Sequence, residues 1–305
     1  MNSRLMDQGA IAEEREVCQE EESPRHDDMP EPDTTEVTAA SFAILSRALN
    51  AVAGNAMNVM AGDERRISAV GLLVKFYAHA SSAFHLSHGT RHPIDSRMRL
   101  DTVSVFVLCR AAFEAFLRFY HIFVDPKTPE AQECMYLGWK WSSLLRQQKY
   151  PTTQAESREV RDEHRMLIEE IEEKLASNQH YGALGKQEAS KLRRDGMTVG
   201  WSKIAASSGL SDLHADHYYS YLCGQAHSGW LDVRQLASSG DREARASISG
   251  ALETIVIAMA FMIDAFTRVF PTSRHVLSNE QAELVRAWRD LGAERQACGH
   301  ASDAG

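Results

Sequence analysis

The sequence predicts an all-α protein, a single-domain bundle of about eight helices that follows a disordered acidic tail. Apolar residues recur at helical spacing through most of the chain, and cap residues and prolines separate these runs. No sustained alternation of β-branched residues predicts strands. The 305 residues are 44% hydrophobic and 25% charged, which is typical of globular proteins and excludes the collagen-like, mucin-like and fully disordered classes.

The negative charge is concentrated at the N-terminus. Residues 1–33 hold eleven acidic and three basic residues, whereas the remainder holds 31 acids and 30 bases within a net charge of −9. We therefore expect a disordered tail over residues 1–33, a helical domain over 34–297 and a second disordered tail over 298–305. A nearly neutral domain gives no overall electrostatic reason to bind nucleic acid or an anionic membrane, and no membrane partner is expected.

Four helices are predicted in the first half of the domain. Capping residues precede a helix over 34–62, and Asp63 begins a second that stops at Gly89. Asp95 or Ser96 is expected to cap the third, which continues to an Asp-Pro pair. Thr128-Pro129-Glu130 begins the fourth, with proline at the first helical position.

The second half contains longer and shorter helical segments. A strongly charged fifth helix is expected from Pro151 to Leu175. Five glycines interrupt residues 178–211, which predicts irregular chain with short helices. A sixth helix is expected over Asp212–His227 and a seventh from Asp241 to Phe270, followed by a last helix that ends at Leu291.

The cellular compartment is inferred from cysteines and apolar runs. The five cysteines have no paired spacing, and the N-terminal segment has no apolar stretch of the signal-peptide kind. The most apolar run, Ile255–Ile263, is shorter than the roughly 20 residues that span a bilayer, so it predicts a buried helix. The sequence therefore favours a reducing cytoplasm.

The predicted third helix carries the first candidate site. Arg110, Glu114 and Arg118 follow each other at four-residue spacing and share one helix face among apolar residues. A buried charge requires a partner. The pattern indicates either an internal ion pair that fixes the helix register or an anion-binding arginine that its carboxylate orients.

The predicted sixth helix carries the second candidate site. Tyr219, Cys223 and His227 lie one turn apart on one face, and Ser228-Gly229 follow. His227 at a helix C-terminus either interacts with the last carbonyls or serves as a general acid or base near neutral pH. Cys223 with His227 as a nucleophile pair is a further alternative that spacing alone permits.

Histidines offer a weaker indication of a metal site. His85 and His88 are three residues apart, as are His214 and His217, so either pair could share one metal. The Glu-x-x-His pair that di-iron bundles require is absent, as are Gly-rich phosphate loops. We therefore expect no metal site and no cofactor.

Several segments together resemble a known family. The segments are Arg110-x-x-x-Glu114, Gly200-Trp201-x-x-Ile204-Ala205, Gly209-Leu210 and Tyr219-x-x-Leu222-Cys223-x-x-x-His227-Ser228-Gly229. Over about residues 65–270 the chain resembles a large bacterial family of uncharacterised all-helical proteins. The resemblance brings no activity, but it implies five positions of interest: Arg110, Glu114, Tyr219, His227 and Ser228.

That family is in turn distantly similar to HEPN-type helical ribonucleases of defence and toxin systems. Those enzymes carry an arginine four to six residues before a histidine near one helix end. Here the residues at these distances before His227 are Cys223, Leu222 and Tyr221, so the linear motif is absent. Arg110 could replace the missing arginine only if its helix packs against the helix that leads to His227.

Two functions follow from these observations. The first is a non-catalytic bundle that acts through protein or small-ligand contacts. The second is a metal-independent ribonuclease or related phosphoryl-transfer enzyme, with Arg110, Glu114 and His227 as catalytic residues and Tyr219 and Ser228 in contact with substrate. The expected partner is a protein or RNA, and apolar helices such as 251–270 would also suit a homo-oligomer.

Overall fold

The fold is all-α in the part of the chain that the structure describes. The structure is a computed structural model, and it describes residues 34–58, 63–91, 94, 96–151, 155–226, 230, 233–234 and 240–293. The strands within these residues are the two-residue β1 (Thr90–Arg91) and β2 (Met98–Arg99), which pair antiparallel. The all-α prediction is confirmed. The tails 1–33 and 298–305, as well as Asp95, His227 and Ser228, lie outside the described residues.

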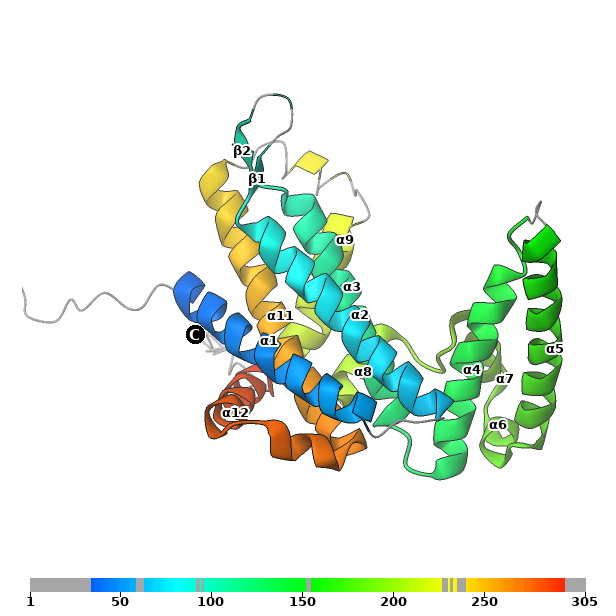
Figure 1. Cartoon of the computed structure of the whole chain (residues 1–305). Helices are drawn as coiled ribbons and strands as arrows, with labels where there is room; N and C mark the ends of the chain where they lie inside the picture. The colour runs from blue at the N-terminus through cyan, green and yellow to red at the C-terminus, as the bar shows by residue number, and fades with distance from the viewer. Residues whose placement is uncertain are drawn as a thin grey trace, which may run out of the picture. The chain divides into compact units, whose positions relative to one another are not determined.

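Long helices come first along the chain, several short ones follow, and two longer helices come last among those described (Figure 1). Their bounds are α1 Thr34–Asn58, α2 Glu64–Ser87, α3 Thr102–Phe123, α4 Pro129–Gln147, α5 Ala155–Ser177, α6 Gln179–Ala183, α7 Lys186–Asp195, α8 Trp201–Ser207, the π-helical turn η1 Leu213–Tyr218, α9 Tyr219–Ala226, α11 Asp241–Val269, the 3₁₀ turn η2 Pro271–Val276 and α12 Asn279–Ala293. The described helices exceed the expected eight because residues 179–207 form three short ones, in agreement with the short helices predicted there.

Two predicted helix starts are confirmed by their capping geometry. The Asp63 carboxylate accepts hydrogen bonds from the backbone N–H groups of Arg65 (3.0 Å) and Arg66 (3.3 Å) at the start of α2. Thr128 Oγ1 accepts from Ala131 N at 3.2 Å, and Pro129 occupies the first turn of α4. Each cap satisfies N–H groups that the helix itself leaves without partners.

The predicted start of the third helix was wrong. α3 begins at Thr102, and its cap is Asp101, whose carboxylate accepts from Ser104 N at 3.0 Å. Ser96 instead has a φ of 55° in the connection between β1 and β2. A cap residue needs extended backbone, which this left-handed conformation does not provide.

The predicted helix Asp212–His227 is not one regular helix. The described chain passes through the π-helical turn η1 before α9, which ends at Ala226. Ser211 donates its N–H to the Gly292 carbonyl of α12 at 2.9 Å, and its hydroxyl lies 2.9 Å from His214 Nδ1. These contacts hold the start of the segment, and apolar periodicity does not reveal them.

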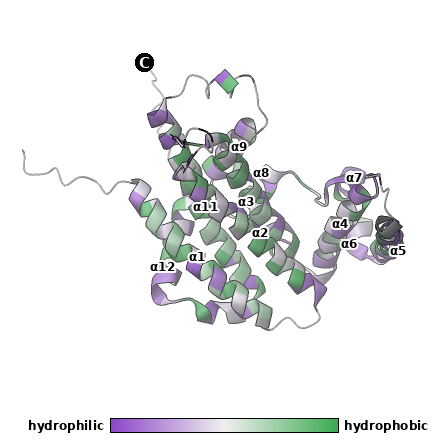
Figure 2. Ribbon diagram, turned by 45° about the horizontal axis from the view of Figure 1, so that its top comes forward, coloured by the Kyte–Doolittle hydropathy of each residue, from purple (hydrophilic) through white to green (hydrophobic). Residues whose placement is uncertain are grey.

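The larger apolar core is assembled around α3 and α11. α3 packs against both α2 and α11, and α1 and α12 pack against α11. Phe113 and Phe116 of α3 are fully buried, as is Phe266 of α11. Burial of each such side chain contributes about 1.5–3 kcal/mol. Figure 2 shows the apolar colouring along these helices, which this core explains.

A second, smaller core lies among α4, α5 and α7. It contains Trp141 of α4, Ile171 of α5 and Leu192 of α7. Gly138 permits the close approach of α4 and α7, because a Cβ atom there would lie 2.4 Å from Leu192 Cδ1. Residues 129–195 therefore contribute a core of their own.

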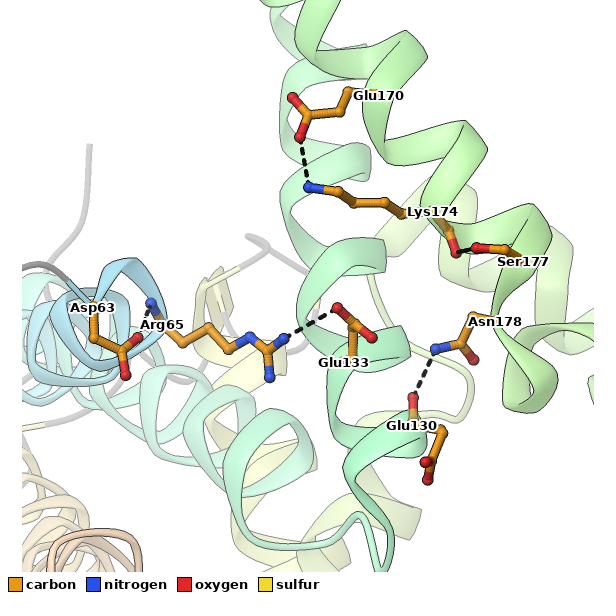
Figure 3. A network of polar contacts seen from close by, with 8 residues as sticks. All are labelled: Asp63, Arg65, Glu130, Glu133, Glu170, Lys174, Ser177 and Asn178. Carbon is orange, nitrogen blue, oxygen red and sulfur yellow. Dashed lines mark hydrogen bonds and ion pairs between the residues drawn. The ribbon is translucent and has the colours of Figure 1, made fainter.

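Polar contacts connect the start of α2 to α4. Lys140 Nζ lies 2.6 Å from Glu64 Oε1, and Arg65 Nη2 lies 3.1 Å from Glu133 Oε1. Figure 3 shows the Arg65 side chain extending from α2 toward Glu133. These partly exposed pairs determine how α2 and α4 are placed more than they add to the free energy of unfolding, because surface ion pairs contribute at most about 1 kcal/mol each.

Three helices are long and apolar enough to cross a membrane by length and composition alone: Thr35–Met57, Glu64–Ser87 and Asp241–Val269. The nine-residue run Ile255–Ile263 is thus the middle of a 29-residue helix, and its length is no argument against a span. In α11, 72% of the most apolar stretch is buried inside the bundle. Packing against α1, α3 and α12 accounts for this apolar composition.

Candidate functional site

The candidate site lies on the middle of α3. Arg110 Nε donates to Glu114 Oε1 at 2.8 Å, one helical turn further along. The side chains are 22% and 28% exposed, so the pair lies at the surface of the core rather than within it. The predicted pairing of Arg110 with Glu114 is therefore present.

Tyr219 of α9 completes this group. Its hydroxyl donates to the same oxygen, Glu114 Oε1, at 3.1 Å. Burial first, and then the negative charge of Glu114, raise the pKa of Tyr219, so the hydroxyl keeps its proton and remains a donor. The Glu114 carboxylate thereby accepts one hydrogen bond from a cation on its own helix, Arg110, and one from a neutral hydroxyl on another helix, Tyr219. We call Arg110, Glu114 and Tyr219 the shared-carboxylate cluster.

Aromatic contacts position α9 against α3. The Tyr219 ring stacks on Phe113 with centroids 6.0 Å apart, and Tyr221 meets Phe106 edge-on at 5.4 Å. The exposed edge of Tyr221 remains at the surface, since this residue is 39% exposed. α3 and α9 therefore pack together. This packing is the condition under which Arg110 could replace the arginine that the linear ribonuclease motif lacks.

The electrostatics of the cluster favour a charged guanidinium. Burial lowers the pKa of Arg110, but the hydrogen bond and charge of Glu114 outweigh burial and raise it. The described part of the cluster can thus orient a permanent cation toward an anionic group, with the Tyr219 hydroxyl fixing the carboxylate that holds the cation.

Two of the five predicted site residues lie outside the described residues. These are His227 and Ser228, which directly follow the last described residue of α9. The structure brings together Arg110, Glu114 and Tyr219, and the positions of the other two stay predictions.

Arg118 has a different role from Arg110, although it shares the helix face. Its Nη1 donates to the carbonyls of Asp195 (3.0 Å) and Gly196 (2.9 Å), and its guanidinium lies 5.0 Å from the centre of the Trp201 ring. Burial lowers the pKa of Arg118 to about 10, which still leaves it charged at neutral pH. Arg118 therefore fastens the connection between α7 and α8 to α3.

His121, one turn from Arg118, was not singled out by any sequence pattern. It is 3% exposed, and its Nε2 accepts from Thr198 N at 3.5 Å. Nδ1 lies 3.9 Å from an Asp125 oxygen and has no hydrogen-bond partner among the described residues. Burial, followed by the charges of Arg118 and Lys191, lowers the pKa of His121 to about 4. The only sequence signal for the burial of His121 was its position on the apolar face of the predicted third helix.

Two further histidines make local contacts. His88 Nδ1 lies 2.8 Å from the Phe84 carbonyl, and His214 Nδ1 lies 2.9 Å from Ser211 Oγ. Across the described ranges, no three side chains of His, Cys, Asp or Glu are arranged to hold a metal ion. His92 lies outside these ranges.

The fold and the cluster together define an all-helical bundle protein in which one carboxylate orients an arginine. The chain belongs to DUF5677, a family of unknown function, whose model matches residues 67–244, more than half of the 305 residues. No curated protein and no solved structure matches the chain. The prediction of an uncharacterised family is confirmed, and the matched range contains the whole shared-carboxylate cluster.

Proposed function

We propose that this protein is a non-catalytic interaction module that binds an anionic group of a protein partner through the shared-carboxylate cluster. The observation that carries this proposal is that Glu114 Oε1 accepts hydrogen bonds from both Arg110 and Tyr219. A guanidinium held in this way loses little side-chain entropy when it binds a carboxylate or phosphate.

The surroundings of the cluster favour a protein partner. Val103 (39% exposed) and Val107 (42%) precede Arg110 on the same face of α3. Tyr221 lies beside them through its contact with Phe106. Exposed apolar side chains next to an oriented arginine and a tyrosine are typical of interface hot spots. The partner would present a carboxylate or phosphate beside an apolar side chain.

The available chemistry also supports binding rather than catalysis. Within the described residues, Tyr219 stays protonated, Arg110 stays charged, and Glu114 is occupied by both of them. Tyr219 and Arg110 therefore do not exchange a proton near pH 7, which a general acid or base must do.

Site-specific photo-crosslinking tests this proposal. A photoreactive residue at Val107 and one at Tyr221 are each expected to capture the same partner in cells. A photoreactive residue at the exposed Met166 of α5 is expected to capture no partner. Adding Arg110→Gln should abolish capture at Val107. The matched substitution Arg165→Gln on α5 should leave it intact. Equal capture from Met166, or capture that survives Arg110→Gln, contradicts the proposal.

A second function, metal-independent RNA cleavage, is favoured by one observation. α3 packs against α9, which is the condition under which Arg110 could stand in for the arginine that the HEPN-type motif lacks. Arg110 would hold the phosphate, Glu114 would orient Arg110, and His227 would act as acid and base. Tyr219 and Ser228 would contact the RNA.

Cleavage of labelled RNA in the presence of EDTA decides between the two functions. A nuclease should lose at least about a hundredfold in rate in His227→Ala, because general acid–base catalysis contributes about 10²–10⁴-fold. Arg110→Gln should lose activity as well, whereas His275→Gln, an exposed change on η2, should not. No cleavage by the folded parent protein removes this function.

We also propose a cytoplasmic location. Cys109 and Cys134 are buried free thiols, and burial raises the pKa of Cys134 to about 11, which keeps it protonated and unreactive. Such thiols are typical of a reducing compartment. A fluorescent fusion that marks the membrane instead of the cytoplasm would contradict this location.

A further inference from the structure

A pocket remote from the shared-carboxylate cluster has a strongly basic lining. Its volume is about 580 Å³, and it lies where the start of α2, the end of α3, the start of α4 and the end of α11 meet. Four cationic side chains line it against the single carboxylate of Asp63: Arg65, Arg66, Lys127 and Arg268. The chain from residue 34 onward is nearly neutral, so this is a local excess of positive charge.

Each arginine of the pocket uses one nitrogen in the ion pairs formed within the described residues. Arg66 Nε lies 3.1 Å from Asp63, Arg65 Nη2 3.1 Å from Glu133, and Arg268 Nη2 2.5 Å from Asp264. Figure 3 shows the contact between Arg65 and Glu133. A guanidinium has five N–H donors, so each of the three retains donors for a ligand.

Lys127 differs from the arginines because it has no ion-pair partner among the residues that the structure describes. It is exposed and directly precedes Thr128, the cap of α4. Arg65 and Arg66 likewise lie in the first turn of α2. Cations are unfavourable at helix N-termini, where the helix dipole is positive, and an anion there would relieve this repulsion.

The floor of the pocket is aromatic. Tyr120, Phe123 and Phe270 line it, and each is buried. The Tyr120 hydroxyl is occupied, because it donates to the Ser207 carbonyl at 2.6 Å. The pocket thus combines apolar surface beneath with cationic groups around its edge, as small-molecule sites commonly do.

We propose that this pocket binds a small ligand that carries two or more phosphate groups. Asp63, Glu133 and Asp264 each pair with one of the three arginines, so Lys127, the free guanidinium donors and the two helix N-termini supply the attraction for a multiply charged anion. Arginine forks also suit phosphate oxygens, which accept paired hydrogen bonds. The aromatic floor would contact an organic portion of the ligand. This site is independent of Arg110 and of the partner surface on α3.

Isothermal titration of the full chain with inorganic pyrophosphate and with ATP, both in EDTA, tests the site. One binding site is expected, and its affinity should fall as salt rises from about 50 to 200 mM. The double variant Arg66→Gln/Arg268→Gln should weaken binding at least about tenfold, and Lys127→Gln about threefold. Arg165→Gln on α5 should bind as the parent does.

Several outcomes would overturn the site. These are no saturable binding of either probe, equal weakening by Arg165→Gln, or binding of a single-stranded RNA 12-mer without binding of pyrophosphate or ATP. Loss of binding in Arg110→Gln would assign the ligand to the shared-carboxylate cluster instead. Lys127→Gln keeps the test decisive if the double variant does not fold, because Lys127 is exposed and has no described ion pair.

Discussion

The hydroxyl of Tyr219 lies 3.1 Å from Glu114 Oε1, the same oxygen that accepts the Arg110 Nε–H at 2.8 Å. Tyr219 and Glu114 are 105 positions apart in the sequence and belong to α9 and α3. This bond couples the orientation of the candidate anion-binding arginine to the packing of α9. A change at Tyr219 should therefore affect both stability and partner binding.

Tyr219→Phe is expected to destabilise the protein by about 1 kcal/mol, since it removes one hydrogen bond and leaves the ring contacts intact. Glu114→Ala should cost more, because it removes this hydrogen bond and also the ion pair with Arg110. Urea unfolding of both single variants and the double variant measures the coupling, which should be about 1 kcal/mol. Strictly additive losses would mean that the bond contributes nothing.

Arg118→Lys is expected to cost about 2 kcal/mol. Lysine cannot reproduce the contacts of one guanidinium with two backbone carbonyls and the Trp201 ring, although it keeps the charge. Thermal unfolding measures the loss. Arg165→Lys, which alters an exposed pair on α5, serves as the control and should change stability by less than about 0.5 kcal/mol. Equal effects of both changes would contradict the role given to Arg118.

Stability should depend on pH through His121. Its pKa is about 4 in the folded chain and 6.5 when unfolded, so below pH 6.5 the unfolded chain binds the proton more readily. The resulting loss begins as pH falls through 6.5 and approaches about 3 kcal/mol near pH 4. His121→Gln should flatten the decline in unfolding free energy between pH 7 and 4.5, whereas the exposed His275→Gln should not. Parallel curves for parent and His121→Gln would contradict the burial effect.

Gly138→Ala is expected to destabilise the smaller core by about 1–3 kcal/mol, because the new Cβ would overlap Leu192. Gly71→Ala is the matched control on α2, where a Cβ meets nothing within 4 Å. That change should stabilise by about 0.5–1 kcal/mol through helix propensity alone. Chemical denaturation of both variants measures the contrast, and a stabilised Gly138→Ala would show that α4 and α7 do not pack closely.

The sequence predicted features that local chemistry determines. The caps at Asp63 and Thr128 and the Arg110–Glu114 pair involve residues within four positions, and all three are present. The start of α3 was wrong because Asp95, Ser96 and Asp101 carry similar capping signals, and only the turn that leads from β1 to β2 distinguishes them.

Long-range relationships could not be predicted from spacing. The Glu114–Tyr219 bond, the contacts of Arg118 with the Asp195 and Gly196 carbonyls, and the basic pocket all join separate elements. Periodicity places a residue on a helix face but does not say which other helix covers that face. His121 shows this most clearly, because burial against a distant connection sets its pKa.

The residues of the two apolar cores leave the ribosome at different moments of protein synthesis, because they occupy different parts of the chain. The core of α4, α5 and α7 needs nothing beyond residue 195, so it can form early on the emerging chain. The larger core needs α11, which begins only at Asp241. Until the ribosome has made α11, the faces of α1 and α3 that pack against it remain open to chaperones or to neighbouring chains. Nascent chains stalled before residue 241 should therefore carry a protease-resistant α4–α7 segment while α1 and α3 are still cleaved.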